Sequence, residues 1–402
     1  MPLNTPTFNH KALMRMALVM AFIQFTNALE YMAFTPLFTF MADRFSVSVS
    51  FSGYVSGVYT LGAVLSGIMA FYWIDVFNKK QFLLKNMGLL GALTFLSTLT
   101  TQFDTLLILR FCAGMVGGTT MGVGTSILMN YAPANLRGKI LATVIASFSM
   151  VSIVGMPAVL FLCTHYGWHS ALWLISLLCL VTLPLIVRIL PADTPPSGVK
   201  AKLSIDIQTL LFASCAAGVQ FSPMLIIPIL APLLTQYLGA QQNLLPLLFL
   251  CGGIAGYLST KITGMLTSRL SALMLATVST LLFIGSLLIP AMGYHNPVLF
   301  ITLFLAASYS RLVSASAVAV HYPADEQRAS FSSLQTVMMF LITTLAFFLS
   351  SLLLPAQGIT TPNLNRLLAI GAIAASGFSI MVIILQKKLA KRHLQSDHII
   401  NQ

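Results

Sequence analysis

The chain has 402 residues, of which 57% are hydrophobic and only 7% are charged, and its mean hydropathy is +0.90. This composition excludes a soluble globular domain and indicates a polytopic membrane protein. The net charge of +12 would suit a nucleic-acid-binding protein, but the basic residues stand mainly between the apolar runs. We therefore interpret the charge as a topology signal and expect no nucleic-acid partner.

Twelve apolar runs are each near the length of about 20 residues that a helix needs to cross a bilayer. The Lys and Arg between them gather on one side, and only Arg44 and Arg366 fall on the other, which predicts that both termini are cytoplasmic. The location that we expect is a bacterial inner membrane. The first run lacks a small-residue cleavage site, so we expect a retained signal anchor. The runs cover 13–40, 51–74, 82–100, 106–131, 139–164, 168–190, 205–235, 244–266, 271–290, 297–321, 330–354 and 364–386.

The first run contains Glu30 well inside the segment, where a charge needs a functional or structural reason. Gln24, Asn27 and Tyr31 accompany it at helical spacing, so one face of the helix is polar and should turn toward a bundle interior or a water-filled cavity. Desolvation disfavours the charged form of a carboxyl group, which lets it load and release protons near neutral pH. We predict that Glu30 carries the proton, the alternative being an acid satisfied by Asn27 and Tyr31.

The fourth run places Arg110 at a depth comparable with that of Glu30. A nearby guanidinium favours the ionised carboxylate, so the two residues are predicted to alternate between a neutral acid and an ion pair, or to form a static buried pair. The same run has Gly114, Gly118 and Gly122 at four-residue intervals, which favours close approach of a neighbouring helix. No strand precedes these glycines and no Lys-Ser/Thr pair follows, which argues against a phosphate loop.

A polar, proline-rich segment at 191–204 separates six runs from six and is interpreted as a cytoplasmic linker. The predicted domains are an N-terminal six-helix bundle over 1–190 and a C-terminal six-helix bundle over 205–402 with a short basic cytoplasmic tail. The segment YAPANLR at 131–137 is similar to YPADEQR at 322–328, at equivalent loops of the two halves. This match favours an internal duplication, as in transporters built from repeats.

The seventh run carries Pro223, Pro228 and Pro232, which should kink or break its outer end, as a gating hinge or as fold geometry. The tenth run contains Arg311 near its middle. Arg311 has three possible roles, namely holding an anionic substrate, pairing with Glu30, and bonding to backbone carbonyls of a neighbouring helix.

A substrate pocket of a carrier built from two bundles should lie near the membrane midplane, mainly apolar and with a few polar groups that orient the ligand. Residues with a polar edge inside the runs are the candidates for this lining. They are Gln24, Asn27, Tyr31, Gln220, Tyr257, Tyr309, Arg311 and Gln335.

Several segments carry a family pattern. They are Glu30 in the first run, DVFNKK at 75–80, LLILRFCAG at 106–114, GMP at 155–157 and GWH at 167–169. Together they resemble the major facilitator superfamily, and within it the branch of twelve-helix drug:proton antiporters and sugar-efflux-like proteins. The resemblance implies an all-α membrane protein with twelve transmembrane helices in two pseudo-symmetric six-helix bundles, the major facilitator fold.

The resemblance also implies a conformational switch. In the family, the acid that corresponds to Asp75 helps to latch the bundles in the outward-facing state, and Arg137 and Arg328 are the charge partners available to it here. Gly155 and Pro157 stand where the antiporter signature lies. A solvated loop acid is the alternative for Asp75.

Two carrier hypotheses follow. The first is proton-coupled export, by antiport, of small amphipathic or cationic molecules. Glu30 and the partial antiporter signature in the fifth run support it. The second is a proton-coupled carrier, for uptake or export, of an anionic metabolite or chelator. Arg311 and the absence of a second glycine after Pro157 support it.

An intramembrane enzyme is a remote third possibility. The chain lacks a His-Glu-x-x-His motif, a membrane Asp pair and a nucleophile elbow, and its five cysteines stand singly in apolar runs without metal-ligand spacing. We therefore expect no enzyme, no bound metal and no cofactor, with the proton gradient as the energy source. The expected partners are a small-molecule substrate, protons and the lipid bilayer, and the expected state is a monomer.

Overall fold

The computed structural model describes residues 10–73, 78–191, 206–319, 322, 328–354 and 359–400. Over these residues the secondary structure is helical, without strands. Twelve of the described helical segments are long and apolar enough to cross a membrane, and each overlaps one predicted run, which confirms the predicted all-α polytopic class. These segments are His10–Phe45, Val49–Ala70, Lys79–Leu99, Phe103–Leu128, Thr143–Tyr166, Trp168–Ile189, Ile207–Tyr237, Gln242–Leu266, Ala272–Ala291, Pro297–Ala319, Phe331–Leu353 and Thr361–Lys388.

The chain divides into two compact units. One contains Met1–Val199 with Gln242–Leu250, and the other contains Lys200–Gln241 with Cys251–Gln402. The predicted linker lies outside the described residues after Pro191.

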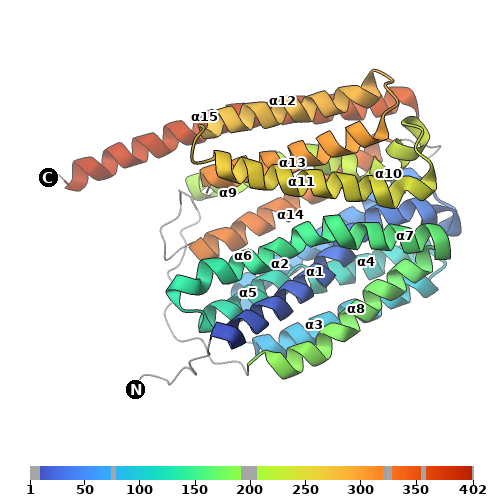
Figure 1. The fold of residues 1–402 in the computed structure, drawn as a ribbon, viewed down its shortest axis with the longest axis horizontal. Helices are drawn as coiled ribbons and strands as arrows, with labels where there is room; N and C mark the ends of the chain where they lie inside the picture. Colours follow the sequence, from blue (N-terminus) through green and yellow to red (C-terminus); the bar gives the residue numbers. More distant parts are fainter. Residues whose placement is uncertain are drawn as a thin grey trace. The chain divides into compact units, whose positions relative to one another are not determined.

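In the first unit, α2 packs against α4, α3 packs against α8, and α1 packs against α6 and α8 (Figure 1). One membrane span consists of α4 and α5, and another consists of α6, a π-helical turn at Val151–Gly155 and α7. The helices are α1 (His10–Met41), α2 (Ser52–Trp73), α3 (Lys79–Leu99), α4 (Phe103–Gly117), α5 (Thr120–Tyr131), α6 (Ala134–Met150), α7 (Met156–Tyr166) and α8 (Trp168–Ile189).

In the second unit, α9 packs against α14, and α12 packs against α13 and α15. The helices labelled after α8 are α9 (Ile207–Ile226), α10 (Leu230–Pro232), α11 (Leu245–Leu266), α12 (Ala272–Ala291), α13 (Pro297–Ala319), α14 (Arg328–Leu353) and α15 (Thr361–Ile400). The core of this unit includes Phe212, Phe331 and Phe378.

The seventh span is broken near its C-terminal end, as its prolines predict. Beyond α9 the chain passes through a 3-10 turn at Ile227–Ile229, the short α10 and a π-helical turn at Leu233–Tyr237. Pro228 and Pro232 supply no backbone N–H here, so a regular ladder of helical hydrogen bonds is not possible. The hydroxyl of Tyr237 donates to the carbonyl of Ile359 at 2.6 Å and fastens this irregular end.

The basic residues at the start of α3 include a structural contact. The ammonium group of Lys80 donates to the carbonyls of Val187 and Leu190, at 2.9 and 2.6 Å, where α8 ends. The last carbonyls of a helix lack intrahelical partners and carry partial negative charge, so a cation stabilises them. Lys80 therefore fastens the start of α3 to the end of α8.

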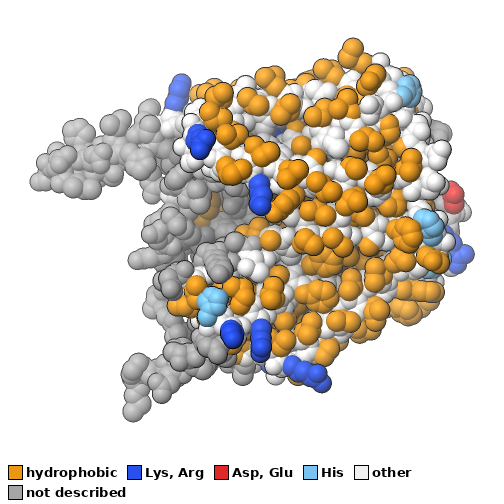
Figure 2. Space-filling model, in the orientation of Figure 1, with side chains coloured by type: hydrophobic (Ala, Val, Ile, Leu, Met, Phe, Trp, Pro, Cys, Tyr) orange, Lys and Arg blue, Asp and Glu red, His pale blue; other side chains and the backbone are white. Residues whose placement is uncertain are grey.

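Large apolar side chains lie on the outside of both units. Leu18, Ile108 and Trp173 are each more than half exposed, at 57%, 63% and 54%. Figure 2 shows hydrophobic side chains over most of the visible helix surfaces, with few Lys and Arg. A surface of this kind fits helices that are surrounded by lipid.

Candidate functional site

The two charges predicted at comparable depth meet inside the first unit. Glu30 on α1 and Arg110 on α4 form an ion pair between Oε1 and Nη1, and their exposed fractions are 0% and 1%. The hydroxyl of Thr94 on α3 lies 3.4 Å from the same carboxylate oxygen and 2.8 Å from the carbonyl of Leu90, so its one proton is shared between two acceptors. Three membrane spans therefore build one buried site around a carboxyl group.

Aromatic rings surround the guanidinium group of Arg110. Its Cζ atom lies 3.7 Å from the ring centre of Phe34 and 4.5 Å from that of Tyr59. The ring of Tyr59 in turn stacks on Tyr31 at 5.2 Å. The negative faces of aromatic rings attract a cation, and this offsets part of the cost of removing Arg110 from water.

The ion pair leaves polar atoms unused. Within the described residues, Oε2 of Glu30 and both Nε and Nη2 of Arg110 have no hydrogen-bond partner. Of these three atoms only Oε2 can accept a proton, whereas the two guanidinium nitrogens can only donate hydrogen bonds. Moving one proton onto the carboxyl group would replace the ion pair by a neutral acid beside a cation.

The polar face of α1 turns into the first unit. Gln24, Asn27 and Glu30 are 3%, 8% and 0% exposed, as expected for a stripe that faces a bundle interior. Asn27 donates to the carbonyl of Gly117, the last residue of α4, at 3.2 Å. The stripe therefore contacts α4 at two points, through Asn27 and through Glu30.

Glycines bring α2 and α4 into backbone contact. A Cβ atom at Gly114 would overlap the backbone of Tyr59, and one at Gly118 would lie 2.6 Å from the Cα and Cβ atoms of Ala63. This approach places Tyr59 beside Arg110. The packing interpretation thus holds for Gly114 and Gly118, whereas a Cβ atom at Gly122 would meet nothing within 4 Å.

A further close contact joins the π-helical turn to α1. A Cβ atom at Gly155 would lie 2.8 Å from Cδ1 of Leu29, the residue before Glu30. Pro157 is the second residue of α7, and because the helix runs on from the π-helical turn, its missing N–H leaves that turn without one donor. Gly155 therefore allows the turn to rest directly beside the site.

Arg311 lies in the second unit, with 0% of its surface exposed. Its Nη2 atom donates to the carbonyl of Ala375 on α15 at 3.3 Å, and its Cζ atom lies 4.7 Å from the ring of Phe283 and 5.6 Å from that of Phe378. Its Nε and Nη1 atoms lack partners within the described part of the chain. Of the three roles considered for Arg311, bonding to a backbone carbonyl is the one with a contact in the structure.

The other candidates for the substrate pocket are half-buried on separate helices of the chain. Gln220 lies on α9, Tyr257 on α11, Tyr309 on α13 and Gln335 on α14. The ring of Tyr309 packs against Gly256, next to Tyr257.

Three residues of the predicted conformational switch lie wholly or partly outside the described part of the chain. Asp75 lies outside the described residues, as do the side chains of Arg137 and Arg328.

Sequence reasoning missed Thr94, Tyr59 and Phe34 as members of the site. Thr94 and Tyr59 are polar residues inside predicted runs, the signal that singled out Asn27 and Tyr31. Phe34 stands one helical turn beyond Glu30 among many apolar residues of the same run, and nothing in the sequence distinguishes it.

Comparison with known proteins identifies the family of the chain. A family model described as Major Facilitator Superfamily matches residues 20–346. A chloramphenicol resistance protein from Streptomyces lividans is 22% identical over 253 residues, which cover 61% of this chain and 64% of that protein. A 4-hydroxybenzoate transporter, PcaK, from Acinetobacter baylyi is 27% identical over 169 residues, which cover 42% and 36%. The chain thus matches less than two thirds of the length of either relative.

Among solved structures, the POT family transporter PepTSo has a TM-score of 0.73 at 10% identity, with 94% of this chain and 99% of that chain covered. At this identity the likeness shows the fold alone.

Proposed function

Because the chain belongs to the Major Facilitator Superfamily, we propose that it is a proton-coupled secondary transporter that exports small amphipathic or cationic molecules by alternating access. The observation that carries this proposal is the buried Glu30–Arg110 pair. Burying a charged pair costs free energy because both groups lose their water. Ionisable residues inside a membrane are therefore taken as functional by default. The proposal includes a bacterial inner membrane location, cytoplasmic termini and a monomer.

The proposed cycle moves one proton at Glu30. When the carboxyl group is ionised, it pairs with Arg110 and accepts from Thr94. When a proton binds, the attraction between the two side chains is lost, while the rings of Phe34 and Tyr59 still hold the guanidinium. Substrate that binds better to one of these two arrangements shifts the balance between them and so couples its own movement to that of the proton.

Export is supported by the partial antiporter signature around Gly155 and Pro157 and by the chloramphenicol resistance protein among the relatives. The second candidate function is a carrier of an anionic metabolite or chelator. It is favoured by Arg311, whose Nε and Nη1 atoms have no partner in the described residues, and by the 4-hydroxybenzoate transporter among the relatives. A carboxylate would suit such a guanidinium.

The test measures proton release from the purified full-length protein in detergent when ethidium, chloramphenicol or 4-hydroxybenzoate is added. We expect ethidium or chloramphenicol to release protons from the wild type and not from Glu30→Gln. The matched control is Asp104→Asn, which neutralises an exposed acid in the first turn of α4. Release that persists in Glu30→Gln would contradict the proposal, and a response to 4-hydroxybenzoate alone, abolished by Arg311→Ala, would favour the second candidate.

A further inference from the structure

The fourth membrane span is broken beside the ion pair. The helix α4 ends at Gly117 and α5 begins at Thr120. In a continuous helix the carbonyls of Val116 and Gly117 would accept from backbone amides four residues later. Here the carbonyl of Val116 accepts from Asn86 at 3.0 Å, and that of Gly117 accepts from Asn27 at 3.2 Å.

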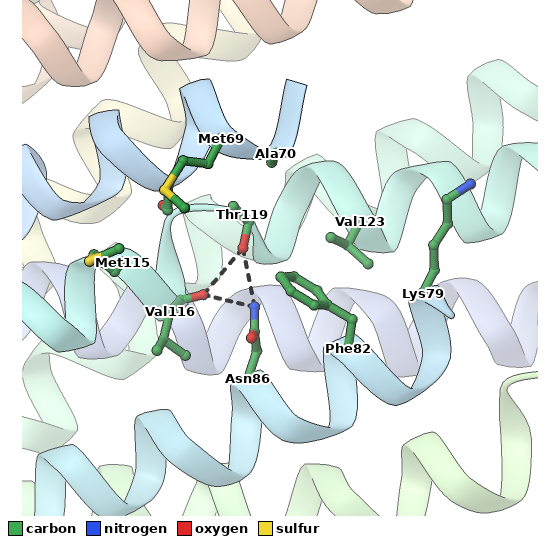
Figure 3. Close-up of a pocket in the computed structure, with 10 residues that line it drawn as sticks. Met69, Ala70, Lys79, Phe82, Asn86, Met115, Val116, Thr119 and Val123 are labelled. Carbon is green, nitrogen blue, oxygen red and sulfur yellow. Dashed lines mark hydrogen bonds between the residues drawn. The ribbon is translucent and has the colours of Figure 1, made fainter. Parts of the chain in front are cut away.

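Two asparagines from different helices help to satisfy the break, together with the hydroxyls of Thr119 and Thr120, which donate to the carbonyl of Val116 at 3.4 and 3.5 Å. Asn27 comes from α1 and Asn86 from α3, and each is 8% exposed. Asn86 also donates to the hydroxyl of Thr119 at 3.1 Å, inside the break itself (Figure 3). Irregular backbone at membrane depth is stable only where protein groups satisfy it, so the break depends on these side chains.

The break and the ion pair share their neighbours. Asn27 and Glu30 are three residues apart on one face of α1, while Gly117 and Arg110 are seven residues apart on α4, about 10 Å along its axis. Tyr59 joins the two places, because its ring lies over Arg110 and a Cβ atom at Gly117 would overlap its hydroxyl group. A shift at the end of α4 would therefore move Arg110 against Glu30.

A cavity of about 310 Å³ lies on the α3 side of the break (Figure 3). Asn86, Val116 and Thr119 line it together with Phe82 and Met115. Tight packing normally holds helices in register, so beside this open volume the hydrogen bonds of Asn86 are one of the restraints on the end of α4.

We propose that Asn86 is a positioning residue for the Glu30–Arg110 pair, because its hydrogen bond to the Val116 carbonyl holds the end of α4 and thereby the approach of Arg110 to Glu30. This inference rests on the proposed function of the pair. Asn86 contacts neither charge, so it acts through the backbone of the fourth span.

The test follows the protonated carboxyl group of Glu30 by infrared difference spectroscopy in the purified full-length protein between about pH 4 and about pH 10. The band is assigned by its absence in Glu30→Gln. The titratable or charged groups around Glu30 are Arg110 on α4, Tyr59 on α2, Cys179 on α8 and Tyr31 on α1, and none of them is altered in the variants tested for Asn86.

We expect Asn86→Leu and Asn86→Ala to move the midpoint of this titration by at least about 0.5 pH unit, and Asn86→Gln, which keeps the amide donor, to restore it. The matched control is Ser170→Ala, because Ser170 on α8 donates to the carbonyl of Leu162 on α7 at 3.2 Å and its loss removes a side-chain bond to another helix elsewhere in the unit. A change in stability alone would leave the midpoint where it is.

Two results would overturn the inference while leaving the proposed function intact. One is an unchanged midpoint in a folded Asn86→Leu or Asn86→Ala variant, and the other is an equal displacement in Ser170→Ala. A wild-type carboxyl group that does not titrate in this range would overturn both the inference and the proposed role of Glu30.

Discussion

Replacing Gly114 by alanine is expected to force α2 and α4 apart. The added Cβ atom would overlap the carbonyl oxygen of Tyr59 and lie 2.7 and 2.9 Å from its C and Cα atoms, all of which are backbone and cannot rotate away. Overpacking of this kind costs about 1–3 kcal/mol. The same substitution at Gly122, where a Cβ atom meets nothing, should gain up to about 1 kcal/mol of helix propensity.

The two variants should therefore differ by about 1–4 kcal/mol, or by about 1–5 °C in melting temperature for a chain of this length. Melting of the purified protein in detergent can be followed with a thiol-reactive dye, because Cys163, Cys179 and Cys215 are free and buried. Equal melting temperatures for Gly114→Ala and Gly122→Ala would refute the claim that glycines set the distance between α2 and α4.

Two further predictions concern buried or capping charges. Lys80→Met should lower the free energy of unfolding by about 1 kcal/mol, because the final carbonyls of α8 lose their cation, whereas Lys85→Met, at an exposed position of α3, should leave the melting temperature unchanged. Arg311→Met should melt at the same temperature as the wild type or higher, because it removes a buried guanidinium with two unpartnered nitrogens. A marked loss of stability in Arg311→Met would show that its contacts with Ala375, Phe283 and Phe378 outweigh the cost of burying the charge.

The twelve spans could be predicted because a helix buried in lipid requires a long apolar run, and such a run can be recognised in the sequence alone. The Glu30–Arg110 pair was within reach for the same reason, since a charge inside such a run stands out and two opposite charges at similar depth have cause to meet. The break in the seventh span also followed from local chemistry, because proline acts on its own backbone.

The rest of the site depends on which helices are neighbours. Whether Tyr59 reaches Arg110 is decided by the approach of α2 to α4 at Gly114, and a pattern along one helix does not name its partner. Asn86 is a similar case. It stands inside the third predicted run and was passed over, because its role becomes visible only when the end of α4 lies beside it.

The π-helical turn at Val151–Gly155 has a consequence for insertions and deletions in the fifth span. A π turn holds one residue more than an α turn, and each α-helical residue rotates the chain by about 100°. The faces of α6 and α7 are therefore rotated relative to each other, compared with their positions in a regular α-helix. Removing one residue from the turn would bring the two helices into one phase. Relative to α7, the face of α6 that carries the exposed Ile145 would then rotate by more than a quarter turn. Except at Gly155, where a Cβ atom would meet Leu29, this short segment should therefore tolerate substitution far better than a change in length.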